Sequence, residues 1–120
     1  MKQGRKISGG KYKRARKRKL YELPGIPRVV KLGKDKGKFL RTRGGNIKRV
    51  SLSAETANVM VKGKAKKAKI KNVLETPSNR FLARQNVLVK GALIDTDLGK
   101  ARITNRPSQD GHVQAILLEK

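Results

Sequence analysis

The sequence predicts an all-β fold: a small closed or nearly closed barrel of short strands, with one short helix and a long basic N-terminal extension. Short apolar segments rich in β-branched residues recur along the chain, glycine, proline and asparagine separate them, and only one stretch has helical spacing. A sandwich fits this pattern too, but a closed barrel also removes exposed strand edges. The extension follows from the first 19 residues, which contain ten cations, no carboxylate and little apolar bulk.

The chain is expected to divide near residue 25 into an arm and a body. Pro24, Gly25 and Pro27 prevent a helix or a central strand, and they form a hinge after the basic run. We therefore expect residues 1–25 to be a basic arm with its hinge and residues 26–120 to be the barrel body. The arm has too little to bury, so it is expected to order only against dense negative charge.

Four strands are expected in the first half of the body, at residues 28–32, 38–42, 47–52 and 57–61. A glycine-flanked turn between the first two predicts that they form a hairpin. A second turn, Arg43-Gly44-Gly45-Asn46, offers glycines that tolerate positive φ, and a polar turn is expected at residues 53–56. The sequence thus predicts a run of short, locally paired strands.

A lysine-rich turn at residues 62–66 precedes a strand with strict alternation. Lys67, Lys69 and Lys71 alternate with Ala68 and Ile70, so the three ammonium groups are expected on one face and the apolar groups on the other. A lysine face can protect an edge strand from aggregation, or it can contact phosphate. The two interpretations are equally supported and compatible.

One helix is expected at residues 80–85, after the helix-starting residues 76–79, and it is expected to plug one end of a sheet. The pattern then returns to strands. They are expected at residues 87–89, 92–97, 100–104 and 113–118, with a proline and glycine loop at residues 105–111 before the last one.

The charge balance indicates the class of partner. Lysine and arginine number 32 against 8 acidic residues, which gives a net charge of +24. Such an excess favours nucleic acid as the partner. Aromatic residues are few, so we expect recognition of folded nucleic acid by backbone and shape. Cysteine is absent, which excludes disulfides, zinc knuckles and thiol catalysis, and no membrane span or signal peptide is visible, so an intracellular protein without a membrane partner is expected.

Catalytic, metal and cofactor sites are not expected. The sequence around Gly10-Lys11 lacks the earlier glycine and the following Ser or Thr of a phosphate-binding P-loop. His112 has no second histidine or thiol to pair with. Asp95 and Asp97 could bind Mg²⁺, but ion pairs with Lys100 or Arg102 are favoured. A small-molecule substrate is therefore not expected either.

Several separate motifs carry a resemblance to a known family. They are the opening MKQGRKISGG, Leu20-Tyr21-Glu22-Leu23, Arg41-Thr42-Arg43-Gly44-Gly45-Asn46, Lys90-Gly91-Ala92, Gly99-Lys100-Ala101-Arg102, and Arg106-Pro107 with Gln109-Asp110-Gly111. Together they resemble the small ribosomal subunit protein eight family of the archaeal and eukaryotic type, in its short archaeal form. The resemblance implies an all-β barrel with a basic arm in the small subunit of the cytoplasmic ribosome, partnered by small-subunit ribosomal RNA and neighbouring small-subunit ribosomal proteins, without enzymatic activity.

The residues expected to bind RNA fall into three groups. The arm contributes its cations together with a serine and two glycines: Lys2, Arg5, Lys6, Ser8, Gly9, Gly10, Lys11, Lys13, Arg14, Arg16, Lys17, Arg18 and Lys19. The arginine-glycine turn contributes Arg41, Arg43, Gly44, Gly45, Asn46, Lys48 and Arg49, and the alternative interpretation is a plain hairpin turn beside two exposed arginines. A further patch is expected at Lys100, Arg102 and Arg106.

Two other functions compete with ribosomal RNA binding. The charge alone also permits a DNA-binding architectural protein of the chromatin type, but such a protein would be served by repeated basic surfaces, and this chain has no internal repeat. The run at residues 13–19 resembles a nuclear-localisation signal, as any basic run does. A membrane-binding helix is disfavoured because the basic run lacks an apolar face.

Overall fold

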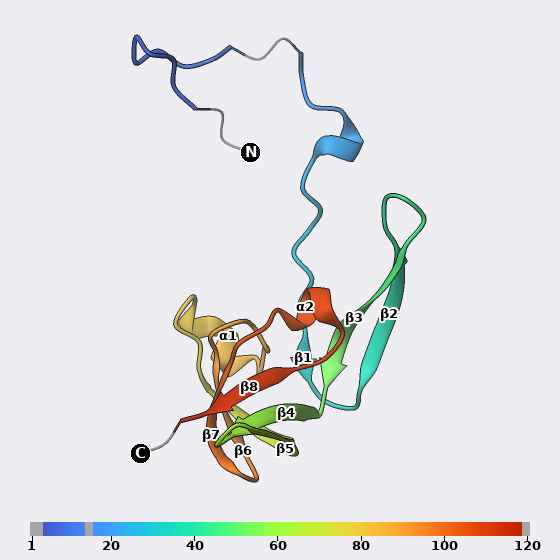
Figure 1. The fold of residues 1–120 in the computed structure, drawn as a ribbon, viewed down its shortest axis with the longest axis vertical. Coiled ribbons are helices and arrows are strands. Elements are labelled where there is room, and N and C mark those ends of the chain that lie inside the picture. Colours follow the sequence, from blue (N-terminus) through green and yellow to red (C-terminus); the bar gives the residue numbers. More distant parts are fainter. Residues whose placement is uncertain (1–3, 14–15, 119–120) are drawn as a thin grey trace.

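The computed structural model describes residues 4–13 and 16–118 (Figure 1). Two sheets make up the body: a three-stranded sheet and a closed five-stranded barrel, so the predicted all-β fold with a small barrel is confirmed. The strands are β1 (Lys31–Leu32), β2 (Lys36–Arg41), β3 (Ile47–Ala54), β4 (Thr56–Val61), β5 (Lys64–Glu75), β6 (Leu93–Thr96), β7 (Gly99–Ile103) and β8 (Gln114–Leu117). The described helices are a 3₁₀ turn η1 (Leu20–Glu22), α1 (Arg80–Arg84) and α2 (Pro107–Asp110).

The barrel closes through strands from both halves of the body. β4 pairs antiparallel with the first half of β5, β5 pairs through its second half with β6, and β8 returns to lie parallel to β4. The alternation predicted for β5 is confirmed, because Ala68 and Ile70 are buried while Lys67, Lys69 and Lys71 are exposed. The interior is aliphatic and is centred on fully buried side chains such as Leu88, Ile94 and Ile103.

The small sheet has β3 in the centre, with β1 parallel to it on one side and β2 antiparallel to it on the other. The hairpin predicted between residues 28–32 and 38–42 is therefore wrong. The first of these segments pairs elsewhere: Leu88 N–H donates to Val30 O at 2.8 Å and Leu32 N–H donates to Asn86 O at 2.9 Å. Because these partners lie more than 50 residues away in the sequence, local turn signals could not reveal them.

Three other local expectations fail. The polar turn expected at residues 53–56 shrinks to Glu55, because Ser53 and Ala54 stay in β3 to pair with β1. The strand expected at residues 87–89 is reduced to one bridge between Val87 and Lys31. The loop at residues 105–111 contains α2, so the structure has two short α-helices where one was expected.

The short helix α2 is explained by residues at both of its ends. Pro107 occupies the first position, where its missing N–H is no loss, and Gly111 adopts φ +71° at the C-cap, a conformation that favours glycine. Asp110 accepts a hydrogen bond from Arg106 N–H at 3.1 Å, which fixes the start of the turn. The sequence therefore contains start and stop signals for this helix, but a helix of one turn is too short to show a helical spacing of apolar residues.

Residues 4–13 and 16–29 extend away from the body at the end that carries α2 (Figure 1). Among the residues that the structure describes, Val30 is the first buried one. The radius of gyration, 18.3 Å, exceeds the ~14 Å expected for a compact chain of this length, because of this extension. Among the described residues, no helix combines the length and the apolar character needed to cross a bilayer.

Candidate nucleic-acid interface

The β2–β3 hairpin projects from the body toward the N-terminal extension and ends in the predicted arginine-glycine turn (Figure 1). Thr42 N–H donates to Asn46 O at 2.7 Å, and the Thr42 hydroxyl donates to the same oxygen at 2.9 Å. Gly44 and Gly45 adopt φ +83° and +82°, values that favour glycine, so the predicted turn is confirmed. The turn leaves the side chain of Arg43 exposed at the tip.

The two faces of the hairpin differ. On one face Phe39 lies opposite Arg49 and Arg41 lies opposite Ile47, and all four side chains are exposed. On the other face Lys48 Nζ donates to Gln109 Oε1 of α2 at 2.6 Å. Lys48 and Arg49, predicted together as one patch, therefore point to opposite faces, as neighbouring residues in a strand must.

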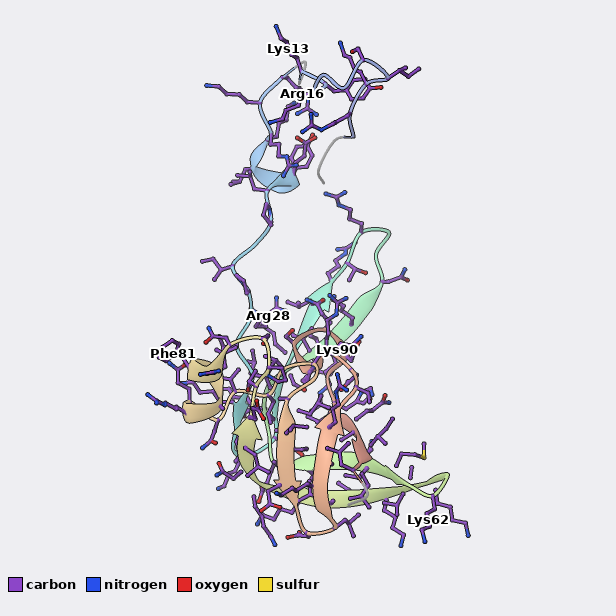
Figure 2. The ribbon with its side chains drawn as sticks, turned by 90° about the vertical axis from the view of Figure 1, so that its left-hand side faces the viewer. Lys13, Arg16, Arg28, Lys62, Phe81 and Lys90 are labelled. Carbon is purple, nitrogen blue, oxygen red and sulfur yellow. The ribbon has the colours of Figure 1, made fainter. Side chains whose placement is uncertain are left out.

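Helix α2 fixes the hairpin to the root of the extension. Arg28 Nη1 donates to Ser108 O at 3.1 Å, and Arg28 lies where the extension meets the body (Figure 2). Gly111, at the end of α2, lies so close to β3 that an added Cβ would be 3.0 Å from Arg49 O. The hairpin, α2 and the chain at Arg28 consequently form one connected end of the body.

Residues 4–13 form a small loop of their own. Lys6 N–H donates to Gly10 O and Gly9 N–H donates to Lys6 O, both at 2.9 Å. The backbones of Arg5 and Lys11 pair across the loop in an isolated antiparallel β-bridge. Gly9 has φ +80°. Arg5 Nη1 also donates to Gly9 O at 2.9 Å, and Lys6 Nζ lies 5.8 Å from the centre of the Tyr12 ring. All residues of the loop are nevertheless exposed.

One arm cation is held by a carboxylate. Arg16 makes two hydrogen bonds to Glu22, Nη1 to Oε2 at 2.9 Å and Nη2 to Oε1 at 2.7 Å, and Lys19 N–H also donates to Glu22 Oε2 at 3.1 Å. The side-chain bond from Arg16 and then the Lys19 backbone bond lower the pKa of Glu22, and the same carboxylate raises the pKa of Arg16. Arg16 is thus engaged within the chain, although its side chain remains exposed (Figure 2).

A contact joins this turn to the hairpin, since Arg43 Nη2 donates to Tyr21 O at 3.5 Å. The remaining predicted arm residues lie along the extension. Ser8, Gly10, Lys11, Lys17 and Lys19 are exposed, Arg18 is half-buried, and Lys2 and Arg14 lie outside the described residues. The structure therefore brings the tip of the hairpin close to the 3₁₀ turn η1 of the arm. The tip contains Arg41, Arg43, Gly44, Gly45 and Asn46.

The third predicted patch is not brought together. Lys100 and Arg102 lie on the exposed face of β7, and Arg102 lines an apolar cavity of about 620 Å³ with Lys90 and Ile116. Arg106 lies beyond the other end of β7, at the start of α2. Arg106 therefore belongs with the hairpin end of the body, whereas Lys100 lies by the β6–β7 turn at the opposite end (Figure 1).

Asp97 and His112 have structural partners. Asp97 pairs with Lys71 Nζ at 3.3 Å among the described residues, so the pairing expected with Lys100 or Arg102 is wrong for this carboxylate. His112 Nε2 lies 3.0 Å from Gln114 Nε2 at the surface. In the part of the chain that the structure describes, no group of three histidine, cysteine or acidic residues could hold a metal ion.

Comparison with known proteins identifies the family of this chain. The profile of the family described as "Ribosomal protein S8e" matches residues 1–118. The chain belongs to the S8e family.

Three curated S8e relatives, each named small ribosomal subunit protein eS8, resemble this chain over nearly its whole length. The one from Methanoregula boonei is 43% identical over 116 residues, covering 95% of this chain and 93% of the relative. The one from Nanoarchaeum equitans is 45% identical, covering 96% and 92%, and the one from Methanocorpusculum labreanum is 43% identical, covering 96% and 94%. The predicted resemblance to this family is confirmed.

Sequence reasoning missed the placement of the aromatic residues in this S8e protein. Phe81 was expected to plug a sheet with the helix, but it is 67% exposed with Arg84 6.0 Å from its ring, and it projects from α1 (Figure 2). Tyr12, Tyr21 and Phe39 are also mainly exposed. Burying such a side chain would be worth about 1.5–3 kcal/mol, so a core without aromatic residues is unusual for a chain that has four.

Proposed function

We propose that this protein is a structural constituent of the small ribosomal subunit of the cytoplasm, where it binds ribosomal RNA and lies beside other small-subunit proteins. Membership of the S8e family across residues 1–118 carries the proposal. The names of the three relatives support it, as does a net charge of +24, which phosphate can balance. The role is one of binding and scaffolding rather than catalysis.

The proposed interface is the end of the body that carries the hairpin, α2 and the root of the arm. Exposed cations of the hairpin tip and arm would displace counterions from the RNA backbone, and the guanidinium groups of Arg41 and Arg43 would bind phosphate in two-point contacts. Gly44 and Gly45 would let the backbone approach phosphate closely. Arg16 acts in this scheme through Glu22, by shaping the turn that leads into the arm.

We further propose that the chain works as two parts, a basic arm with its hinge at residues 1–25 and the barrel body at residues 26–120. The exposure of residues 4–13 and 16–29, with only Arg18 half-buried among them, supports this division, as does the burial of Val30. The hydrogen bonds of Arg28, Val30 and Leu32 would then anchor the arm in a fixed direction from the barrel. The arm would order fully on RNA, because only there is its charge balanced.

Competition binding tests the proposed function. The full-length protein is mixed with labelled small-subunit ribosomal RNA at fixed salt, and either unlabelled transcript or duplex DNA is added as competitor. The transcript is expected to displace the label at much lower concentration than the DNA, because the interface recognises a folded RNA surface. Equal competition by the two would favour the DNA-binding architectural protein and overturn the proposal.

A further inference from the structure

One face of the β2–β3 hairpin combines aromatic, apolar and cationic side chains in the open. Phe39 and Ile47 are each 71% exposed, and they lie diagonally across from each other on this face. Arg49 lies directly across from Phe39, and Arg41 lies directly across from Ile47. Side chains opposite each other in such a ribbon are about 5 Å apart, and those two positions apart along a strand are about 7 Å apart.

The residues around Phe39 leave its ring exposed. Gly37, two residues before Phe39, has no side chain, and the Arg49 guanidinium lies over it: a Cβ added at Gly37 would be 2.7 Å from Arg49 Nε. The opposite face of the hairpin is occupied by the contact between Lys48 and Gln109 of α2. The ring of Phe39 is therefore left free toward solvent, with a guanidinium on one flank and an aliphatic side chain on the other.

Charge and shape on this face match a nucleotide in an unpaired stretch of RNA. A nucleobase presents a flat surface that can stack on an aromatic ring, and its own phosphate group lies within reach of a neighbouring arginine. A protein partner would have to neutralise Arg41 and Arg49 while also covering Phe39 and Ile47. A paired RNA helix would offer phosphate but would keep its bases stacked inside.

We propose that this face, defined by Phe39, Arg41, Ile47 and Arg49, binds an unpaired base of ribosomal RNA, with Phe39 as the stacking surface and the two arginines as phosphate ligands. The proposal rests on the proposed function and adds base stacking to recognition by charge. It also gives a reason why Phe39 stays outside a core that could have used it. An aromatic ring can stack on any of the four bases, so this face is expected to prefer unpaired nucleotides without preferring a particular base.

A tryptophan probe tests the proposal directly. The chain contains no tryptophan, so Phe39→Trp introduces a single indole at the site, and Phe81→Trp introduces one at an equally exposed phenylalanine on α1 as the matched control. Titration with a short oligouridylate is expected to quench Phe39→Trp in a saturable way, and the same strand paired with oligoadenylate is expected to leave it unquenched. Equal quenching of both variants, or by the duplex, would indicate adventitious association and overturn the proposal.

Affinity for small-subunit ribosomal RNA supplies the second readout. Phe39→Trp is expected to bind like the wild type, whereas Phe39→Leu, which keeps apolar bulk without a ring, is expected to bind about tenfold more weakly. Thermal melting should be unchanged because the side chain is exposed. Wild-type affinity in Phe39→Leu would refute stacking while leaving ribosomal RNA binding intact. If in addition Phe39→Ala reduced incorporation into assembled subunits, the face would contact a protein.

Discussion

Neutralising the exposed cations of the arm should reduce the salt dependence of RNA binding. The variant replaces six lysines and arginines by glutamine: Arg5, Lys6, Lys11, Lys13, Lys17 and Lys19. Arg16 is kept because it holds Glu22. Each phosphate contact contributes about 0.7 to 0.9 to the slope of log affinity against log salt, so six contacts contribute about 4 to 5. A twofold rise in salt should then weaken the wild type about 16- to 32-fold more than the variant.

Filter binding or fluorescence anisotropy with small-subunit ribosomal RNA, repeated over a range of salt, measures this slope. The matched control replaces Lys62, Lys64 and Lys66, which lie at or beside the β4–β5 turn, and Lys62 lies at the far end of the body from the arm (Figure 2). This control should change the slope by less than one. An arm variant with the wild-type slope would remove the arm from the interface.

Three further results follow from the packing and the ion pairs. Gly111→Ala should lower the free energy of unfolding by about 2 kcal/mol, since it combines a positive φ with a clash against β3, whereas Gly91→Ala, with positive φ but open space, should cost about 1 kcal/mol in chemical denaturation. An NMR titration should find the pKa of Glu22 below its ordinary value. The 3₁₀ turn η1, which the ionised Glu22 holds, should therefore persist as the pH falls to that ordinary value. It should be lost as the pH falls further through the lowered pKa. Arg16→Gln should raise this pKa, and an unchanged value would contradict the pairing. Leu88→Ala should lower the free energy of unfolding by about 2–5 kcal/mol, because the side chain is fully buried, and a loss under 1 kcal/mol would contradict its place in the core.

Features governed by neighbouring residues were predictable from the sequence. The alternation along β5 gives one buried and one exposed face because side chains in a strand point to opposite sides. The glycine pair in the turn at residues 43–46 adopts the positive φ that glycine permits. Helix α1 begins after Asn79, whose side chain accepts a hydrogen bond from Phe81 N–H at 3.0 Å.

Features governed by distant residues were not predictable. The segment at residues 28–32 bonds to Asn86 and Leu88 instead of to the strand that follows it, and nothing in its composition distinguishes the two partners. The candidate site shows the same limit. Clustering of cations in the sequence indicated the hairpin, but whether Lys48 and Arg49 act together, and whether Phe39 is buried, depends on how the hairpin packs against α2.

The measurement that most directly tests the proposed function is sedimentation of cell extract on a density gradient, followed by washing at rising salt. The protein is expected in the fractions of the small ribosomal subunit, and it should leave them only as salt disrupts its phosphate contacts. Recovery with chromosomal DNA, or free of any ribosomal particle at low salt, would contradict the account.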